Sequence, residues 1–280
     1  MFAKVLMFIA ALMPFTGNLE AAFWDGFFSS DVKPVPKTIK VLIVHDKPGV
    51  VLEVKGKYAL YDPNKNKKHI STRFLGKRKF IQAVSDGIRW GEEFPGVYQL
   101  LIIPDEKTMT TVVDGHDYQG NLYIYDIGGN ISIVNELELD DYLNSVLSAN
   151  YKAPLTEEAA AAIAIAARTN ALYFAENPNN TFWSLDAKVV GYQGYSAIEP
   201  TSQIVQAVEA TKQMVMSQSK NKEGTMPFPA EWILSAGQSQ SEARLALISL
   251  QEAENLSQKG NHAAEILKKA FPGTSIQLTD

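Results

Sequence analysis

The segment from Ala159 to Ala167 contains only alanine and isoleucine, and it constrains the fold more than any other stretch of the chain. Thr156 precedes the segment as a candidate N-cap, and two glutamates follow where the helix dipole favours negative charge. Asn177 and the proline after it supply a stop signal. The pattern therefore predicts a helix from Thr156 to about Glu176. A helix that is apolar all round is buried on every side, so we expect this one at the centre of a helical core.

Upstream of Leu139 the chain has the pattern of an antiparallel β region. Short runs rich in Val, Ile, Leu and Tyr are separated by Gly, Pro, Asn and Asp, as expected of strands and turns. The runs are IKVLIV, GVVLEV, KYALYD, YQLLIIP, TTVVDG, GNLYIYDI and NISIVNEL. At Leu139 the period changes from two residues towards that of a helix. The sequence predicts an α+β fold, with a β-rich part over 38–138 and a helix-rich part over 139–280.

The helix-rich part is predicted to hold three more helices and one long loop. The helices fall at Thr201–Met216, Gln240–Gln258 and Asn261–Ala270. The loop covers Asn177–Glu199 and carries several aromatic residues. Loops of this length in a compact domain are usually functional.

The first residues have the pattern of a secretory signal peptide, predicted over 1–22, with a linker over 23–37. Lys4 is followed by an apolar run of 11 residues and then by small residues at 21 and 22. This run is shorter than the roughly 20 residues that a membrane-spanning helix needs, so we expect cleavage and export to the periplasm or cell-wall compartment, with no permanent span afterwards. Retention as an anchor is the alternative, because Leu19 and Glu20 fit a cleavage site poorly.

Composition excludes several classes of site. The chain has no cysteine, so it forms neither disulfides nor thiolate metal sites, and its four histidines are too widely spaced to predict a metal site or a cofactor. A net charge of −5 argues against a nucleic-acid partner. Between Asp62 and Asp86 seven Lys and Arg residues occur with no acidic residue. That stretch is either a hairpin with a basic, aggregation-resistant edge or a surface for an anionic polymer or lipid headgroup.

Residues 135–178, NELELDDYLNSVLSANYKAPLTEEAAAAIAIAARTNALYFAENP, resemble the central signature of the stage II sporulation protein D and amidase-enhancer LytB family. That signature has a Leu-Glu-Asp-Tyr-Leu motif, a turn that ends in Glu-Met, and an alanine-rich helix that ends in Ala-Arg-Thr-Tyr. Other pieces are similar and occur in the same order: TVVDGHDYQGNLYIY, the turn at 192–194, AVEATKQMVM at 207–216, and the tail AAEILKKAFPGTSIQL. The resemblance covers residues 39–280.

The resemblance implies an α+β domain whose groove holds glycan strands stripped of their peptides and cleaves them as a lytic transglycosylase. In that reaction one carboxyl group acts as acid and then as base, so it must exchange a proton near neutral pH. The family has a glutamate there, and Asn150 occupies the matching position. An amide has no proton to donate, and losing such a group typically lowers the rate by a factor of about 10² to 10⁴.

Further departures fall at polar positions of the implied groove. Ala161 and Ile163 replace Lys and Gln, Val190 replaces a loop Gln, and the segments 231–237 and 245–250 differ from the family's polar motifs. Packing positions are retained. The chain is therefore identified as a member that keeps the fold and lacks the catalytic residue, with Asp186 as the best substitute acid.

The candidate glycan-binding residues are Asn150, Arg168, Trp183, Tyr192, Gln193, Gly194 and Tyr195. Most of them have a second interpretation. Arg168 is either a sugar contact or half of a structural ion pair with Asp140 or Asp141. The aromatic side chains either stack on sugars or anchor the loop. Asp186 is either an acid or the cap of a turn.

The sequence thus predicts an exported protein of peptidoglycan remodelling that binds glycan strands or regulates a wall amidase without catalysis. Two alternatives stay open. One is an active lytic transglycosylase that relies on Asp186 or another carboxylate. The other is a scaffold for a cell-division or envelope complex, which the apolar Ala161 and Ile163 favour, because a sugar groove lined with them loses hydrogen-bonding partners.

Overall fold

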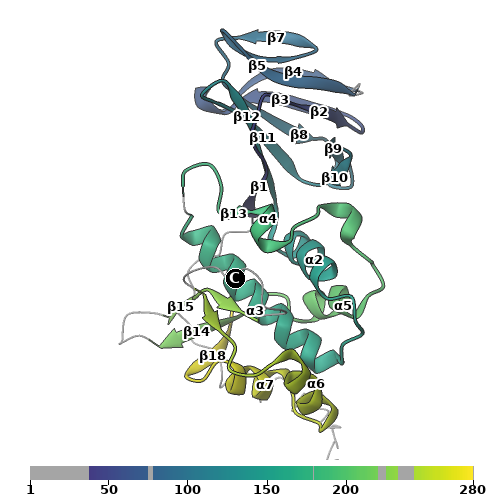
Figure 1. Ribbon diagram of the computed structural model, residues 1–280, viewed down its shortest axis with the longest axis vertical. Coiled ribbons are helices and arrows are strands. Elements are labelled where there is room, and N and C mark those ends of the chain that lie inside the picture. Colours follow the sequence, from purple (N-terminus) through teal and green to yellow (C-terminus); the bar gives the residue numbers. More distant parts are fainter. Residues whose placement is uncertain (1–37, 75–77, 179, 220–224, 233–242, 280) are drawn as a thin grey trace, which may run out of the picture.

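The computed structural model describes residues 38–74, 78–178, 180–219, 225–232 and 243–279 (Figure 1). The predicted signal peptide and linker, 1–37, lie outside the described residues. The fold is α+β, as predicted. Two β-sheets form one end of the molecule and a helical part forms the other.

A seven-stranded sheet and a six-stranded sheet make up the β-rich part. The larger sheet has the order β13 (Leu185–Asp186), β1 (Thr38–Lys47), β12 (Asn130–Glu138), β11 (Asn121–Ile127), β8 (Gln99–Pro104), β3 (Tyr58–Asp62), β4 (Lys68–Arg73). The smaller sheet has the order β10 (His116–Tyr118), β9 (Thr111–Val113), β2 (Gly49–Val54), β5 (Lys79–Val84), β6 (Gly87–Trp90), β7 (Glu92–Pro95). Neighbours pair antiparallel, except that β13 pairs parallel with β1 and so joins the later half of the chain to the sheet.

Alternation along the strands gives the larger sheet two different faces. Leu100 and Ile102 belong to the main core, which also contains Leu52 and Ile81 of the smaller sheet. Leu101 points the other way, into a second cluster that is rich in tyrosine. One face of the larger sheet therefore shares a core with the smaller sheet.

The basic stretch between Asp62 and Asp86 is not a single hairpin. Its first strand, β4, pairs with β3 at the edge of the larger sheet, whereas β5 lies inside the smaller sheet between β2 and β6. The two flanks of the stretch therefore separate into different sheets, and only β4 provides a basic edge.

The helix-rich part is built around α3 (Glu157–Glu176), whose bounds agree with the prediction. Between Ala159 and Ala167 every residue is buried except Ala161 and Ala167, which are half-buried. The helices α2 (Leu139–Asn150), α5 (Gln203–Ala210), α6 (Leu250–Gln258) and α7 (Ala263–Ala270) pack against it. Thr156 holds the N-cap position, but its hydroxyl oxygen does not accept the expected capping bond from a backbone N–H of the first turn.

Two predicted helices are shorter than expected. The helix predicted over Thr201–Met216 ends at Ala210, and Gln213 then adopts a left-handed conformation with φ of 64°, which a helix cannot contain. The chain continues as β14 (Met214–Ser219), which pairs with β15 (Thr225–Met226) and with the C-terminal β18 (Thr274–Leu278).

The helix predicted from Gln240 begins only at Leu250, because Ser249 caps it through a bond from the Glu252 N–H. Two short strands, β16 (Ala230–Glu231) and β17 (Arg244–Leu245), lie before it. Residues 233–242 lie outside the described part. Within that part, no helix has both the length and the apolar character that a bilayer span requires.

Candidate functional site

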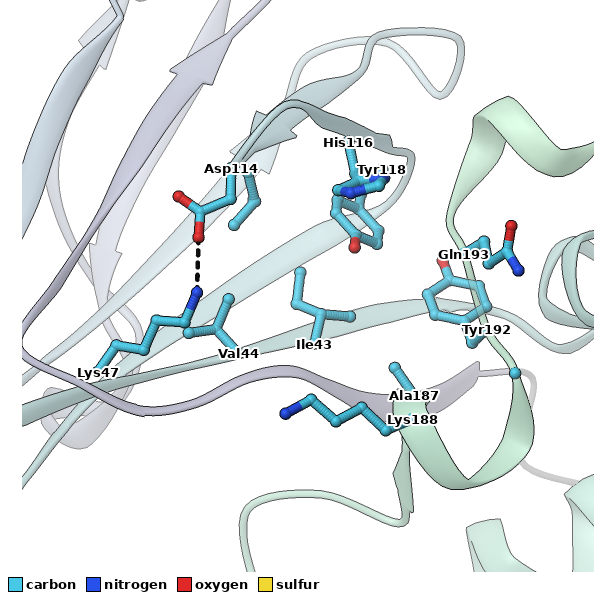
Figure 2. Close-up of a pocket in the computed structure, with 12 residues that line it drawn as sticks. Ile43, Val44, Lys47, Asp114, His116, Tyr118, Ala187, Lys188, Tyr192 and Gln193 are labelled. Carbon is cyan, nitrogen blue, oxygen red and sulfur yellow. Dashed lines mark hydrogen bonds and ion pairs between the residues drawn. The ribbon is translucent and has the colours of Figure 1, made fainter. Parts of the chain in front are cut away.

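A pocket of about 530 Å³ lies where the β-rich part meets the helix-rich part (Figure 2). The β-rich part contributes Ile43, Val44, Lys47, Val113, Asp114, His116 and Tyr118. The short helix α4 (Ala187–Val190) and the turn after it contribute Ala187, Lys188, Gly191, Tyr192 and Gln193. Residues roughly 70 to 150 positions apart in the sequence thus face one another across one cavity.

The β9–β10 hairpin forms one wall of the pocket. Val113 pairs with His116, so Asp114 and Gly115 form a two-residue turn, and both have positive φ, as a type I′ hairpin requires. The Asp114 carboxylate accepts hydrogen bonds from Lys47 Nζ at 2.9 Å and from the Val51 N–H at 3.3 Å. His116 and Tyr118 are two residues apart on one strand, so both face the pocket.

The opposite wall follows β13. Asp186 accepts a hydrogen bond from the Lys188 N–H at 2.9 Å and so caps α4, and Gly191, with φ of 73°, ends the helix. Gly194 is held between two elements: its carbonyl accepts from Ser145 Oγ of α2 at 2.6 Å, and a Cβ there would lie 2.4 Å from the Asp117 carbonyl oxygen of β10. This turn therefore requires glycine.

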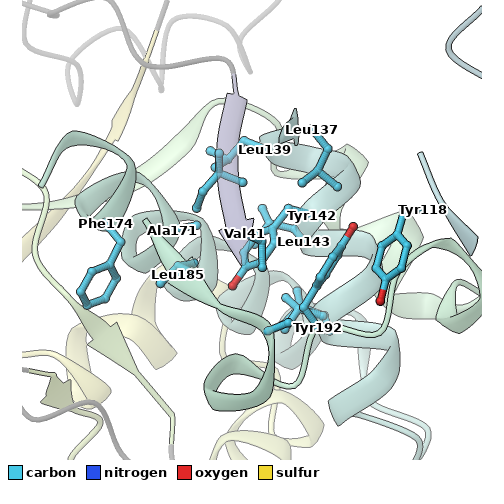
Figure 3. Close-up of a cluster of buried hydrophobic side chains, with 14 of the residues drawn as sticks. Val41, Tyr118, Leu137, Leu139, Tyr142, Leu143, Ala171, Phe174, Leu185 and Tyr192 are labelled. Atoms are coloured by element: carbon cyan, nitrogen blue, oxygen red, sulfur yellow. The ribbon is translucent and has the colours of Figure 1, made fainter. Parts of the chain in front are cut away.

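Tyr192 joins this wall to the sheet. Its ring is buried, and its hydroxyl donates a hydrogen bond of 2.6 Å to Asn135 Oδ1 on β12. The rings of Tyr118 and Tyr142 lie 6.0 Å and 5.9 Å from it, inside the apolar cluster that connects the two parts of the molecule (Figure 3). Burial raises the pKa of Tyr192 well above its ordinary value, so the phenol stays protonated as a donor.

Tyr118 differs from Tyr192 in its polar end. Its side chain is 8% exposed, and its hydroxyl makes no hydrogen bond with any residue in the described part of the chain. Burial raises its pKa to about 12. The pocket therefore contains a neutral hydroxyl donor that the protein itself does not use.

Asn150, the last residue of α2, lies behind Gly191. Its side-chain Nδ2 donates to the carbonyl of Val146 at 2.8 Å, within its own helix, and to the carbonyl of Val190 at 3.2 Å, at the end of α4. A Cβ on Gly191 would lie 2.8 Å from Asn150 Oδ1. The Val190 bond thus ties α2 to the α4 turn, and an ionised carboxylate could make neither bond.

Comparison with known proteins shows which family the chain resembles. The family model described as SpoIID, stage II sporulation protein, matches residues 128–217, which run from the start of β12 into β14 and include α2, α3 and the α4 turn. The chain is 35% identical over 217 residues to an uncharacterized protein of Chlamydia pneumoniae, with 76% of this chain and 78% of that protein covered. It is 32% identical over 246 residues to an uncharacterized protein of Chlamydia muridarum, with 86% and 78% covered.

The chain belongs to the SpoIID family. This membership confirms the resemblance found in the sequence and indicates a cell-wall related function. A third relative, an uncharacterized protein of Brachyspira hyodysenteriae, is 28% identical over 176 residues, with 62% of this chain and 46% of that protein covered. The pocket wall formed by α4 lies inside the matched SpoIID region, whereas the β9–β10 wall lies before it.

Arg168 of the SpoIID region lies away from the pocket, in the helical core. The residue is 2% exposed. Its Nε and Nη2 donate to Asp140 at 3.3 and 3.1 Å. Nη2 also donates to the Val208 carbonyl at 2.8 Å. Nη1 donates to the carbonyl and to the hydroxyl of Thr211, at 2.7 and 3.1 Å. A longer bond of 3.4 Å joins Nη1 to the Met214 carbonyl, so the five N–H donors of the guanidinium are shared among six bonds. The ion pair with Asp140 is present, and the carbonyls of Val208 and Thr211 are those at the end of α5.

The remaining sequence candidates separate into different places. Tyr192 and Gln193 line the pocket, and Gly194 lies directly beside them. Trp183 belongs to the tyrosine-rich cluster on the other face of the larger sheet, where its ring lies 5.8 Å from that of His45. Tyr195 begins a short 3₁₀ turn and is 42% exposed. Of these candidates, only the residues of the Tyr192–Gly194 turn therefore lie at the pocket.

The structure also places two of the positions at which the sequence departs from the polar groove residues of the family. Ile163 is buried in the main core, and Val190 is half-buried, with its carbonyl bound by Asn150. The sequence did not point to His116, Tyr118 or Lys188. The Asp114-Gly115 hairpin turn was the available signal for the first two, because it sets which residues of the second strand share a face.

Proposed function

We propose that this SpoIID protein is exported, binds peptidoglycan glycan strands at the pocket between its two parts, and does not cleave them. The observation that carries the proposal is the state of Asn150. Cleavage needs a group at this position that gives a proton to the departing sugar oxygen and then takes one back. Asn150 has no acidic proton, and both of its amide hydrogens are bound to backbone carbonyls.

The shape of the site supports binding. Long, donor-bearing side chains and an aromatic ring surround an apolar floor of Ile43 and Val44, which is the usual composition of a small-molecule or sugar site. The hydroxyl of Tyr118 and the amide of Gln193 are available to the polar groups of a sugar.

The test combines binding and product analysis on the purified protein without residues 1–22. The protein should pellet with purified peptidoglycan, and digestion of peptide-free glycan should release no anhydro-muramyl products by mass analysis. Gln193→Ala should weaken pelleting, whereas Gln258→Ala, at the far end of the helical part, should not. Release of anhydro products at an ordinary enzymatic rate would refute the proposal.

A second candidate, an active lytic transglycosylase, keeps one specific observation in its favour. Burial, followed by the neighbouring charges of Glu138 and Asp140, raises the pKa of the Asp141 carboxyl at the start of α2. A raised pKa suits a general acid. Asp186, by contrast, accepts a backbone hydrogen bond that caps α4. If products appear, Asp141→Asn and Asp186→Asn identify which carboxylate is used.

Regulation of a wall amidase is the further role that we propose for a non-cleaving member. A protein that marks glycan strands can increase an amidase's local concentration on them without new catalytic residues. Co-pelleting of an amidase with the wall in the presence and absence of the protein tests this role. Fractionation of cells that produce the full-length chain tests export.

A further inference from the structure

Basic side chains and exposed aromatic rings occur together at the end of the β-rich part that lies farthest from the helices. β4 and β5 lie at this end, opposite α6 and α7 (Figure 1). Residues 62–93 hold eight Lys and Arg residues against four Asp and Glu, which is a net charge of +4 in a chain whose net charge is −5. Positive charge is therefore concentrated at this end of the molecule, away from the pocket.

Several of these basic side chains are available to a partner. Four of them are exposed and form no ion pair with a residue in the described part of the chain: Lys67, Lys68, Arg78 and Lys79. Arg73, by contrast, is paired with Glu92. The unpaired charges lie on either side of β4, which is the edge strand of the larger sheet, and reach the start of β5.

Two phenylalanine rings are exposed beside these charges. Phe74, directly after β4, is 72% exposed, and Phe80 on β5 is 52% exposed. Side chains alternate along β5, so the fully buried Ile81 faces the core and Phe80 faces outward. The Phe80 ring lies over Gly49 of β2, where an added Cβ would clash with it. Aromatic rings thus occupy positions at which the solvent-facing side chains of an antiparallel sheet are usually polar.

Charges and aromatic rings together favour one kind of partner. Lysines on an edge strand prevent strand-to-strand aggregation, but exposed phenylalanines beside that edge have the opposite effect. A soluble anionic polymer would bind the charges and leave the rings in water, and a second copy of the chain would bring two surfaces of like charge together. An anionic bilayer accepts both groups, because its headgroups attract Lys and Arg while the rings enter the boundary of the acyl chains.

We propose that this basic-aromatic surface docks the protein on a bilayer that contains anionic lipids. The surface consists of Lys67, Lys68, Phe74, Arg78, Lys79 and Phe80. Docking is a property separate from glycan binding, which uses the pocket. Because the surface lies at the end opposite α6 and α7, a docked protein directs its helical part away from the bilayer. In an exported protein this orientation holds the pocket towards the wall beside the membrane.

Sedimentation with lipid vesicles tests the proposal. The purified chain from residue 23 onward is mixed with vesicles of phosphatidylcholine alone, or of phosphatidylcholine and phosphatidylglycerol in equal parts. Residues 23–37 are kept in every variant, so their contribution is the same throughout. We expect binding to the anionic vesicles that weakens as salt is added, and much weaker binding to the neutral vesicles.

The variants remove one charge or one ring at a time. Lys68→Gln and Arg78→Gln should each weaken binding to anionic vesicles by about fivefold, the factor that one basic residue near an anionic surface contributes. Phe74→Ala and Phe80→Ala should each weaken it by about fivefold as well, because each removes apolar area that enters the bilayer. Circular dichroism checks that each variant is folded.

Two matched controls lie in the helix-rich part. Lys268→Gln removes the same charge from an exposed position on α7, and Leu247→Ala removes an apolar side chain that is 73% exposed. Both should leave vesicle binding unchanged. Equal binding to neutral and anionic vesicles, or unchanged binding in the Phe74 and Arg78 variants, overturns the proposal.

Soluble polyphosphate provides the test of the polymer alternative. If the Lys and Arg variants lose binding to polyphosphate and to vesicles alike while the Phe variants lose neither, the surface serves an anionic polymer and the bilayer proposal is wrong. Pelleting with peptidoglycan is measured separately and uses the pocket variant Gln193→Ala. A protein that pellets with the wall but ignores anionic vesicles therefore refutes this inference alone.

Discussion

Replacing Arg168 tests whether this residue serves the fold or a ligand. The guanidinium is buried and binds Asp140, and it also satisfies backbone carbonyls at the end of α5. Arg168→Met keeps most of the volume of the side chain and removes all five donors. The variant leaves Asp140 without its partner and leaves the carbonyls of Val208 and Thr211 without theirs.

The magnitude follows from the burial of each group. Removing one partner of a buried, hydrogen-bonded ion pair costs about 3–5 kcal/mol. The Asp140 side chain is 29% exposed and regains some hydration, so we expect the lower part of that range, about 3–4 kcal/mol. For a domain of this size such a loss lowers the melting temperature by on the order of 10 °C.

Urea unfolding followed by circular dichroism measures this loss. Asp140→Asn should cost less, about 1–2 kcal/mol, because the guanidinium keeps its bonds to α5. Arg89→Met, at an exposed arginine on β6, should change stability by less than about 0.5 kcal/mol. A loss below about 1 kcal/mol in Arg168→Met, together with loss of wall pelleting, would show that the guanidinium serves a ligand and that this reasoning is wrong.

Three further predictions concern the site and its supports. Tyr192→Phe should cost about 1–2 kcal/mol in urea unfolding because Asn135 Oδ1 loses its donor, whereas Tyr118→Phe should be nearly neutral; equal losses would contradict the assigned hydrogen bonds. Gly194→Ala should lower the free energy of unfolding by about 1–3 kcal/mol, because the added Cβ would clash with the Asp117 carbonyl oxygen. Gly260 also has positive φ but lies in open space, so Gly260→Ala measures the effect of positive φ without the clash. The hydrogen bond to Glu158 raises the pKa of His262. The stability that this pair contributes should therefore be present below about pH 6.5, the ordinary pKa of histidine, and should be lost as pH rises through the higher pKa of the folded state. Glu158→Gln should remove this pH dependence from urea unfolding curves.

The sequence predicted the parts of the fold that depend on local pattern. The apolar α3, the strand runs before Leu139 and the stop before Pro178 all follow from short-range periodicity and capping signals. The C-terminal end of α5 did not follow, because it depends on distant residues, and the start of α6 was missed although Ser249 supplies a local cap. The Arg168 side chain, for example, binds the carbonyls at the end of α5, and β18 at the end of the chain pairs with the segment that was predicted as helix.

The candidate site was predicted only in part for the same reason. The Tyr192–Gly194 turn could be found because the family resemblance marks it. The opposite wall could not be predicted, because no local sequence pattern indicates that the β9–β10 hairpin faces α4. That contact depends on β13 pairing with β1, a pairing of two residues across more than 140 positions. Trp183 shows the converse: it is close to Tyr192 in sequence, yet it lies on the other face of the sheet.

Position 150 links the architecture of the pocket to the proposed absence of cleavage. The Asn150 amide donates to Val190, and Gly191 lies against its oxygen, so the amide fixes the turn that carries Tyr192 and Gln193 into the pocket. A glutamate here would place an acceptor against two backbone carbonyls, which would destabilise the turn or force it to move. A free carboxyl group at position 150 is therefore incompatible with the α4 turn in the conformation that the Asn150 amide holds. In the proposed function, the same side chain that cannot supply a proton also holds a wall of the pocket, which fits a member of the family that binds glycan without cutting it.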